Sequence, residues 1–264
     1  MTHASARFDL RGQAALVLGA AGGLGAAVST GLADHGAAVA LADFRGEEAQ
    51  ALAEQIAAAG GKASAIACDG RVEADIDRAV RHCRDSFGGL DVVVNLVCSA
   101  RLCPVLDMPA EQFDETIHSC LRSAFLISQA AGRAMVEQGR GGSVIHVSSI
   151  AGSAALGRGT GVYAAAKAGV NALVRELAIE WAPHGIRVNA VAPCQFRTPP
   201  LERLLDDPKF GGREALTAKM LANIPLGRLG EPEDLAGPCI FLASRAAAMV
   251  TGHVLFVDGG YTAR

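Results

Sequence analysis

The sequence is poor in aromatic residues, which occupy only 5% of its 264 positions. A β-sandwich of this length would need many aromatic and β-branched side chains in its core, so the composition disfavours that class. The formal charge is −3 and no block of basic residues occurs, so nothing predicts binding to nucleic acid or to a membrane surface. No uninterrupted apolar run approaches the roughly 20 residues that span a bilayer.

The seven cysteines include no CxxC pair, and their odd number argues against a disulfide framework. Cys98 and Cys103 have neither the spacing nor the companion ligands of a zinc site, so we predict no metal. The opening stretch MTHASARFDLRG has no apolar segment of the kind found in signal peptides, which predicts a cytoplasmic protein.

Short, continuously apolar runs alternate with helix-like stretches along the whole chain, as in a parallel sheet that is covered on both faces. We therefore predict one α/β domain over residues 1–264, with a doubly wound, Rossmann-like parallel sheet of seven strands. The predicted strands are 14–19, 37–42, 63–68, 90–97, 143–148, 186–192 and 253–257. The predicted helices lie near 24–35, 46–59, 72–87, 110–138, 160–182 and 231–244. Residues 194–225 interrupt this alternation, and we interpret them as a substrate lid.

A glycine-rich turn follows the first predicted strand, in the stretch LGAAGGLGAA. Gly19, Gly23 and Gly25 would let a pyrophosphate approach the backbone and the N-terminus of the next helix. Asp43 ends the second strand, where a carboxylate accepts hydrogen bonds from ribose hydroxyls and repels a 2′-phosphate. The pattern therefore favours NAD over NADP, although the nearby Arg45 keeps NADP open.

The stretch GVYAAAKAG places Tyr163 and Lys167 four residues apart, on one face of a helix. Taken alone, the pair could be a buried phenol beside a solvated ammonium group. It could also be a phenol whose pKa, ordinarily about 10, is lowered by the neighbouring cation so that it exchanges protons near neutrality.

Several motifs together resemble those of the short-chain dehydrogenase/reductase family, over nearly the whole length. They are the GxxxGxG turn, a Ser-Tyr-xxx-Lys set, RVNAVAP and TGHVLFVDGG, and they occur in the family's order. The resemblance implies that Tyr163 is the proton donor and acceptor at the substrate oxygen. It implies that Lys167 lowers the pKa of that tyrosine, and that Ser149 holds the substrate oxygen. Ser148 remains the alternative to Ser149.

The resemblance also implies a nicotinamide cofactor, which we expect to be NAD. The residues expected to bind it are Gly19, Gly23, Leu24, Gly25, Asp43, Asp69, Asn95, Tyr163, Lys167 and Thr198. The family resemblance further suggests a homotetramer or homodimer, formed through the helices near 110–138 and 160–182.

Three cysteines depart from the family's pattern. The usual NNAG is NLVC here, ending in Cys98, and Cys120 stands where an asparagine holds a relay water. Cys194 replaces a glycine near the nicotinamide. A thiol is a weak hydrogen-bonding group, so we expect reduced or narrowed activity unless Ser119 or Ser123 replaces the asparagine.

The leading prediction is an NAD(H)-dependent oxidoreductase that interconverts a secondary alcohol and a ketone. One alternative is a 3-oxoacyl thioester reductase that uses NADP(H), with Arg133 and His184 as contacts for an acidic carrier protein. Another is an impaired nucleotide-binding or scaffold protein. The residues expected to flank a small-molecule substrate are mostly apolar: Ala154, Ala155, Leu156, Gln195 and Phe196. His146, inside a predicted strand, is interpreted as structural.

Overall fold

A single parallel sheet forms the centre of the computed structural model, which describes residues 4–157, 159–206 and 211–263. Within these residues the sheet has seven strands in the order β3-β2-β1-β4-β5-β6-β7, and every neighbouring pair is parallel. The predicted doubly wound sheet is therefore confirmed. The strands are β1 (Ala14–Leu18), β2 (Ala38–Asp43), β3 (Lys62–Ala67), β4 (Val92–Asn95), β5 (Gly142–Val147), β6 (Ile186–Pro193) and β7 (Val254–Val257).

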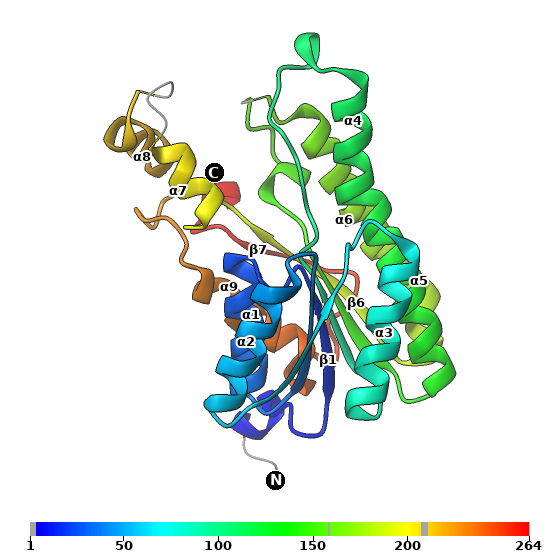
Figure 1. Ribbon diagram of the computed structural model, residues 1–264. Coiled ribbons are helices and arrows are strands. Elements are labelled where there is room, and N and C mark those ends of the chain that lie inside the picture. The colour runs from blue at the N-terminus through cyan, green and yellow to red at the C-terminus, as the bar shows by residue number, and fades with distance from the viewer. Residues whose placement is uncertain (1–3, 158, 207–210, 264) are drawn as a thin grey trace.

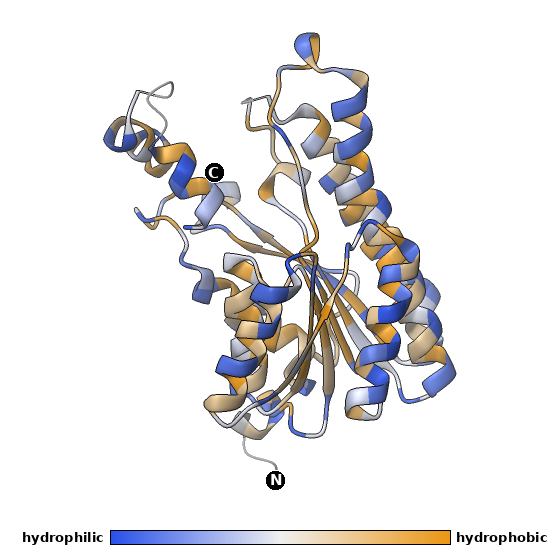
Figure 2. Cartoon of the chain, viewed as in Figure 1, coloured by the Kyte–Doolittle hydropathy of each residue, from blue (hydrophilic) through white to orange (hydrophobic). Residues whose placement is uncertain are grey.

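Helices cover both faces of the sheet, which explains why its strands are largely apolar (Figures 1 and 2). One face carries α1 (Gly23–Asp34), α2 (Gly46–Ala58) and α9 (Pro232–Ala243), and the other carries α3 (Glu73–Phe87), α5 (Ser123–Gln138) and α6 (Gly161–Trp181). Alternate residues of one strand enter opposite cores. In β1, for example, Val17 packs with α1 and α9, whereas Leu16 packs with α3.

The predicted helix 110–138 has an interruption that we did not expect. It consists of α4 (Ala110–Ile117), a π-helical turn (His118–Arg122) and α5. Inside the turn, the Ser119 hydroxyl donates to the Thr116 carbonyl at 3.3 Å, and the Ser123 hydroxyl donates to the Ser119 carbonyl at 2.5 Å. Serine hydroxyls that compete for helix carbonyls favour such irregular turns, and this one presents Cys120 to the end of β4.

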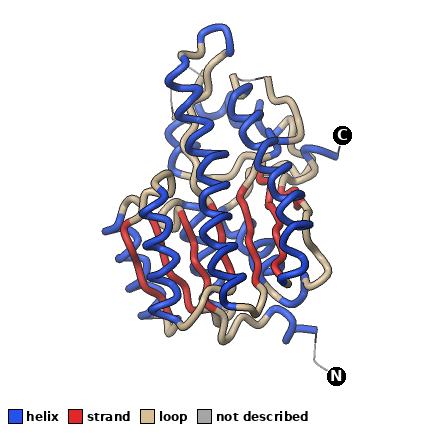
Figure 3. Tube along the Cα trace, turned by 90° about the vertical axis from the view of Figure 1, so that its right-hand side faces the viewer, coloured by secondary structure: helices blue, strands red, loops and turns tan. Residues whose placement is uncertain are grey.

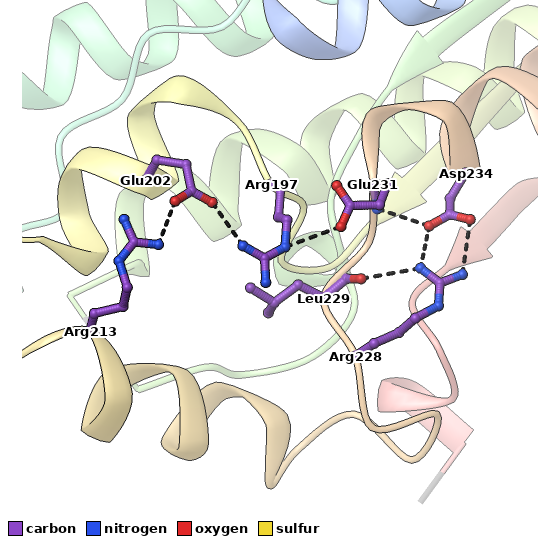
Figure 4. A network of polar contacts seen from close by, with 7 residues as sticks. All are labelled: Arg197, Glu202, Arg213, Arg228, Leu229, Glu231 and Asp234. Carbon is purple, nitrogen blue, oxygen red and sulfur yellow. Dashed lines mark hydrogen bonds and ion pairs between the residues drawn. The ribbon is translucent and has the colours of Figure 1, made fainter.

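The proposed lid contains two short helices that sequence reasoning did not predict, α7 (Pro199–Leu205) and α8 (Arg213–Leu221). They have a small core of their own, made of Leu205, Met220, Ile224 and Leu229. A chain of ion pairs joins this segment to the start of α9, because Arg197 contacts both Glu202 at 3.2 Å and Glu231 at 3.1 Å (Figure 4). Residues 207–210 of the proposed lid lie outside the described residues.

The strands' carboxyl ends lie between two projecting groups of helices (Figures 1 and 3). In Figure 1, α7 and α8 stand on one side of this edge, and α4 with the start of α6 stands on the other. The glycine-rich turn and the residues that follow β2, β4, β5 and β6 meet at this edge, where open α/β sheets bind their ligands.

Candidate active site

The glycine-rich turn has no room for side chains at two positions. Gly19 has a φ of +82°, and a Cβ atom there would lie 3.2 Å from the backbone carbon of Leu96. A Cβ atom on Gly25 would lie only 2.0 Å from the Gly19 carbonyl oxygen. The turn therefore exposes backbone at the N-terminus of α1, where the helix dipole and free N–H groups favour an anion. These features fit the pyrophosphate of a dinucleotide.

Asp43 is buried at the end of β2 and is bonded to the turn. Its Oδ2 accepts a hydrogen bond from the Ala21 N–H at 2.9 Å, and its Oδ1 accepts from the Arg45 N–H at 3.0 Å. The Arg45 side chain pairs with Asp43 through Nε at 3.3 Å and with Glu48 through Nη1 at 2.8 Å. One guanidinium therefore lies between two carboxylates at the position expected for the adenosine ribose.

Asp69 and Thr198 also lie at this edge of the sheet. The Asp69 carboxylate forms an ion pair with Arg71 at 2.7 Å, and hydrogen bonding from Arg71 lowers the pKa of Asp69. Thr198 lies against the glycine-rich turn, because a Cβ atom on Gly23 would be 3.8 Å from its methyl group. The structure therefore brings the beginning of the proposed lid to the turn.

Asn95, the last residue of β4, forms hydrogen bonds with neighbouring parts of the chain and does not project as a free side chain. Its side-chain oxygen accepts from the Val97 N–H at 2.9 Å, and its amide nitrogen lies 3.1 Å from His146 Nδ1. The other nitrogen of His146 lies 2.9 Å from the Ser128 hydroxyl, which itself donates to the Ala124 carbonyl. Burial lowers the pKa of His146 to about 4. The predicted structural role of this histidine is confirmed.

The two neighbouring serines after β5 differ in direction. Ser148 is turned toward α6, where its hydroxyl donates to Asn171 Oδ1 at 2.6 Å. The Ser149 Oγ accepts from the Ala151 N–H at 3.1 Å, and it also forms a hydrogen bond with Tyr163. Since adjacent strand residues point to opposite sides, only Ser149 faces the tyrosine.

Tyr163 and Lys167 face each other on α6, with Lys167 Nζ 5.8 Å from the centre of the tyrosine ring. Nζ also donates a hydrogen bond to the Val147 carbonyl at 2.8 Å. Burial raises the pKa of Tyr163, while the charge of Lys167 and the Ser149 hydrogen bond lower it, and the net direction is upward. The charge of Lys167 acts in the expected direction, but burial, together with Cys98 and Cys120, outweighs it, so the pKa of Tyr163 is raised and not lowered.

The thiols of Cys98 and Cys120 lie next to this pair, with their Sγ atoms 3.4 Å apart. The hydrogen bond from Cys120 lowers the pKa of Cys98 to about 6, against the effect of burial, and the charge of Lys167 lowers it further. Neither nearby serine takes the place of the missing asparagine. Ser119 donates to the carbonyls of Ser99 and Thr116, and Ser123 donates to a carbonyl within its own helix.

A cavity of about 630 Å³ opens beside the turn that follows Ser149. Ala154 and Ala155, two of the residues expected to flank a substrate, line it, whereas Phe196 is buried in the core. The cavity is more polar than expected, because side chains from the end of the lid and from the C-terminal segment contribute to it. Its other lining residues are Ser153, Asn223, Phe256, Tyr261 and Thr262. Of these residues only Phe256 belongs to a motif named above, TGHVLFVDGG, and the fold brings them together from three distant segments.

Neither a metal centre nor a membrane helix is found in the described part of the chain. No group of three or more His, Cys, Asp or Glu residues there could hold a metal ion. No helix there combines the length and the apolar character needed to cross a membrane.

Known proteins resemble this chain over nearly its full length. The model of a family described as enoyl-(acyl carrier protein) reductase matches residues 19–262. The chain is 43% identical over 256 residues to an L-rhamnose 1-dehydrogenase (NAD(P)(+)) of Azotobacter vinelandii. This match covers 93% of this chain and 94% of the relative. It is 42% identical over 260 residues to an uncharacterized oxidoreductase of Mycobacterium tuberculosis, in a match that covers 98% of this chain and 94% of the relative.

A solved structure gives the same picture in three dimensions. The gluconate 5-dehydrogenase from Burkholderia cenocepacia, in complex with NADP and tartrate, superposes with a TM-score of 0.91. It is 33% identical in sequence, and the match covers 99% of this chain and 100% of that one.

Proposed function

This chain belongs to the short-chain dehydrogenase/reductase family of oxidoreductases, and we propose that it interconverts a secondary alcohol and a ketone with NAD(H). The observation that carries the proposal is the arrangement of Ser149, Tyr163 and Lys167 at the carboxyl edge of the sheet. A pure nucleotide-binding or scaffold protein would have no use for this set.

The three side chains have distinct roles in the proposed reaction. The Ser149 Oγ accepts from the Ala151 N–H and still has its own proton to donate, and with this proton it would hold the substrate oxygen. The Tyr163 hydroxyl gives a proton to that oxygen during reduction and takes it back during oxidation. Lys167, held by the Val147 carbonyl, keeps a positive charge beside the phenolate that forms. When bound, the nicotinamide supplies or accepts the hydride at the carbinol carbon.

The local charge balance supports NAD(H) as the cofactor. Arg45 is the basic residue nearest the end of β2, and two carboxylates, Asp43 and Glu48, already pair with it. A 2′-phosphate would have to compete with both acids for one guanidinium, whereas ribose hydroxyls could donate to them.

The cavity supports a hydroxylated substrate of small size. Its serine, asparagine, tyrosine and threonine residues supply hydrogen-bonding groups, while Ala154 and Ala155 leave space. Two of the similar proteins are named for the sugar or sugar acid on which they act, L-rhamnose and gluconate. We therefore propose a sugar, a sugar acid or a polyol, and we propose that residues 194–225 close over it.

The alternative reaction on a thioester carried by an acidic protein has less support. The two basic residues suggested for carrier contact, Arg133 and His184, line a pocket on α5 and α6 together with Glu137 and Glu180. The acids offset the bases, so this surface offers no basic docking site for an acidic carrier.

The experiment follows reduced-nicotinamide absorbance with NAD and then NADP across sugars, sugar acids and polyols. Turnover with NAD that falls by at least about a hundredfold in Tyr163→Phe supports the proposal. Equal turnover in that variant would contradict the role of the tyrosine. Binding of NADH without turnover of any substrate would favour the nucleotide-binding alternative.

We also propose that the protein forms a homotetramer or a homodimer. The outer faces of α5 and α6 expose Phe125, Val136 and Ile179, which a single chain leaves in contact with water. Burying such side chains against a second copy would be favourable, at about 25 cal/mol per Å² of apolar area.

A further inference from the structure

Cys98 and Cys120 form a pair that the proposed reaction does not use. They come from segments 22 residues apart, since Cys98 follows β4 and Cys120 lies in the π-helical turn, yet their sulfur atoms are 3.4 Å apart. A disulfide requires about 2.05 Å, so the two sulfur atoms would have to approach each other by about 1.4 Å. The residue Cys98 is exposed and Cys120 is buried, so a small reagent would reach the pair from the side of Cys98.

We propose that Cys98 and Cys120 form a redox-active dithiol site, in which a small peroxide oxidises Cys98 and Cys120 then closes a reversible disulfide. Reactive cysteines of this kind are accessible, lie near a positive charge and have a second thiol within reach. Cys98 meets all three conditions, with Lys167 as the charge and Cys120 as the second thiol.

The chemistry balances with hydrogen peroxide as the oxidant. The Cys98 thiolate attacks one peroxide oxygen, an S–O bond forms, the O–O bond breaks, and the second oxygen leaves as hydroxide, which takes up a proton to become water. This step oxidises the sulfur by two electrons and yields a sulfenic acid. The Cys120 sulfur then attacks the Cys98 sulfur, so that an S–S bond forms, the S–O bond breaks, and the oxygen leaves as water with the thiol proton of Cys120.

The other cysteines lack this combination. Burial raises the pKa of Cys68, Cys83 and Cys239 to about 12, and that of Cys194 to about 11. Such thiols carry almost no thiolate at neutral pH and react slowly. Cys103 is half-buried and provides the matched comparison, because it lies in the same loop after β4 as Cys98.

The test uses Cys103→Ser as the parent protein, so that the tryptic peptides 85–101 and 102–122 contain one cysteine each. After hydrogen peroxide treatment and capping of free thiols under denaturing conditions, we expect these peptides to be joined and to separate again with dithiothreitol. Adding Cys120→Ser should leave Cys98 as a sulfenic acid that dimedone captures. Adding Cys98→Ser should leave Cys120 reduced.

Rates give a second readout that does not depend on the cross-link. In the otherwise unchanged chain, iodoacetamide should alkylate Cys98 at least about tenfold faster than Cys103. The proposal is overturned if peroxide leaves both peptides unlinked, if Cys98 reaches the sulfinic acid while Cys120 stays reduced, or if Cys98 is alkylated no faster than Cys103. None of these readouts requires a substrate or a cofactor, so they stand apart from the test of the proposed function.

Discussion

The Lys167 ammonium group lies 5.8 Å from the centre of the Tyr163 ring and is fixed there by the Val147 carbonyl. The charge that acts on the phenol is therefore set by the backbone of β5 and by a single turn of α6. The negative charge of Cys98 acts on the same two groups, raising the pKa of both Tyr163 and Lys167.

Removing Cys98 should move the pH dependence of alcohol oxidation. Tyr163 accepts a proton in this direction and works when deprotonated, so the rate rises with pH through its pKa. The negative charge of Cys98 raises that pKa, so Cys98→Ala should lower it and move the rising limb to lower pH. The measurement is kcat/KM against pH, with Cys103→Ala as the control that should not move. If the rising limb stays in place or moves to higher pH, the charge of Cys98 does not raise the pKa of Tyr163.

Glu48→Ala should weaken the discrimination against NADP. The substitution frees Arg45 Nη1 from its ion pair at 2.8 Å, leaving Asp43 as its remaining carboxylate. We expect the ratio of kcat/KM for NADP to that for NAD to rise by about tenfold, equivalent to about 1.4 kcal/mol. Glu47→Ala, at the neighbouring position, is the control. An unchanged ratio would mean that the ion pair does not hold Arg45 away from the nucleotide.

Gly25→Ala should destabilise the fold itself. The added Cβ would lie 2.0 Å from the Gly19 carbonyl oxygen, a separation that only a shift of backbone can relieve. We expect a loss of at least about 2 kcal/mol in the free energy of unfolding, measured with urea. Gly22→Ala in the same turn would place its Cβ 3.7 Å from that oxygen and should cost less than about 1 kcal/mol. Equal costs for the two variants would show that the close approach is not limiting.

Because of His146, the free energy of unfolding should decrease as the pH falls. Burial lowers its pKa to about 4, whereas in the unfolded chain the value is about 6.5. The unfolded state therefore binds more protons between these values, and stability decreases as the pH falls through that window. Between pH 7 and pH 4 this contribution amounts to about 2–3 kcal/mol.

His146→Gln tests this contribution. The variant should lose less stability than the parent over the same pH range, although it starts lower at pH 7 because the bonds to Asn95 and Ser128 change. His35→Gln, at an exposed position, should retain the parent's full pH dependence. Parallel stability profiles for the parent and His146→Gln would contradict the prediction.

Phe125→Glu should disrupt the proposed oligomer. Phe125 is 48% exposed on α5, and a carboxylate there would have to be desolvated when two copies associate. Light scattering after size-exclusion chromatography should report a smaller mass for this variant than for the parent. Met249→Glu, an exposed position before β7, should leave the mass unchanged. If the Phe125→Glu variant has the same mass as the parent, the subunits do not associate through the surface around Phe125.

The sheet and its main helices were predictable because most strands consist mainly of apolar residues and each covering helix separates two strands. The predicted strands begin and end close to the observed ones, as in β1 and β6. The π-helical turn was not predictable, because the apolar spacing on either side of His118–Arg122 looks like that of one continuous helix. The prolines that start α7 at Pro199 concealed that helix, since they also occur in loops.

The site was predictable where a single helix or strand end carries it. Tyr163 and Lys167 could be paired from their spacing, whereas the choice between Ser148 and Ser149 needed the direction of each side chain. The contact between Cys98 and Cys120 depends on the π-helical turn, so no spacing in the sequence indicates it. The net direction of the Tyr163 pKa depends on burial, which the fold alone determines.

The hydrogen bond between the Ala21 N–H and Asp43 has a consequence for the energetics of ligand exchange. It joins the glycine-rich turn to the end of β2 through two groups of the chain itself. The conformational entropy of this turn is therefore lost during folding rather than during binding. A nucleotide can arrive and depart while the turn keeps its shape, and the Ala21 amide should exchange with deuterium equally slowly in both states.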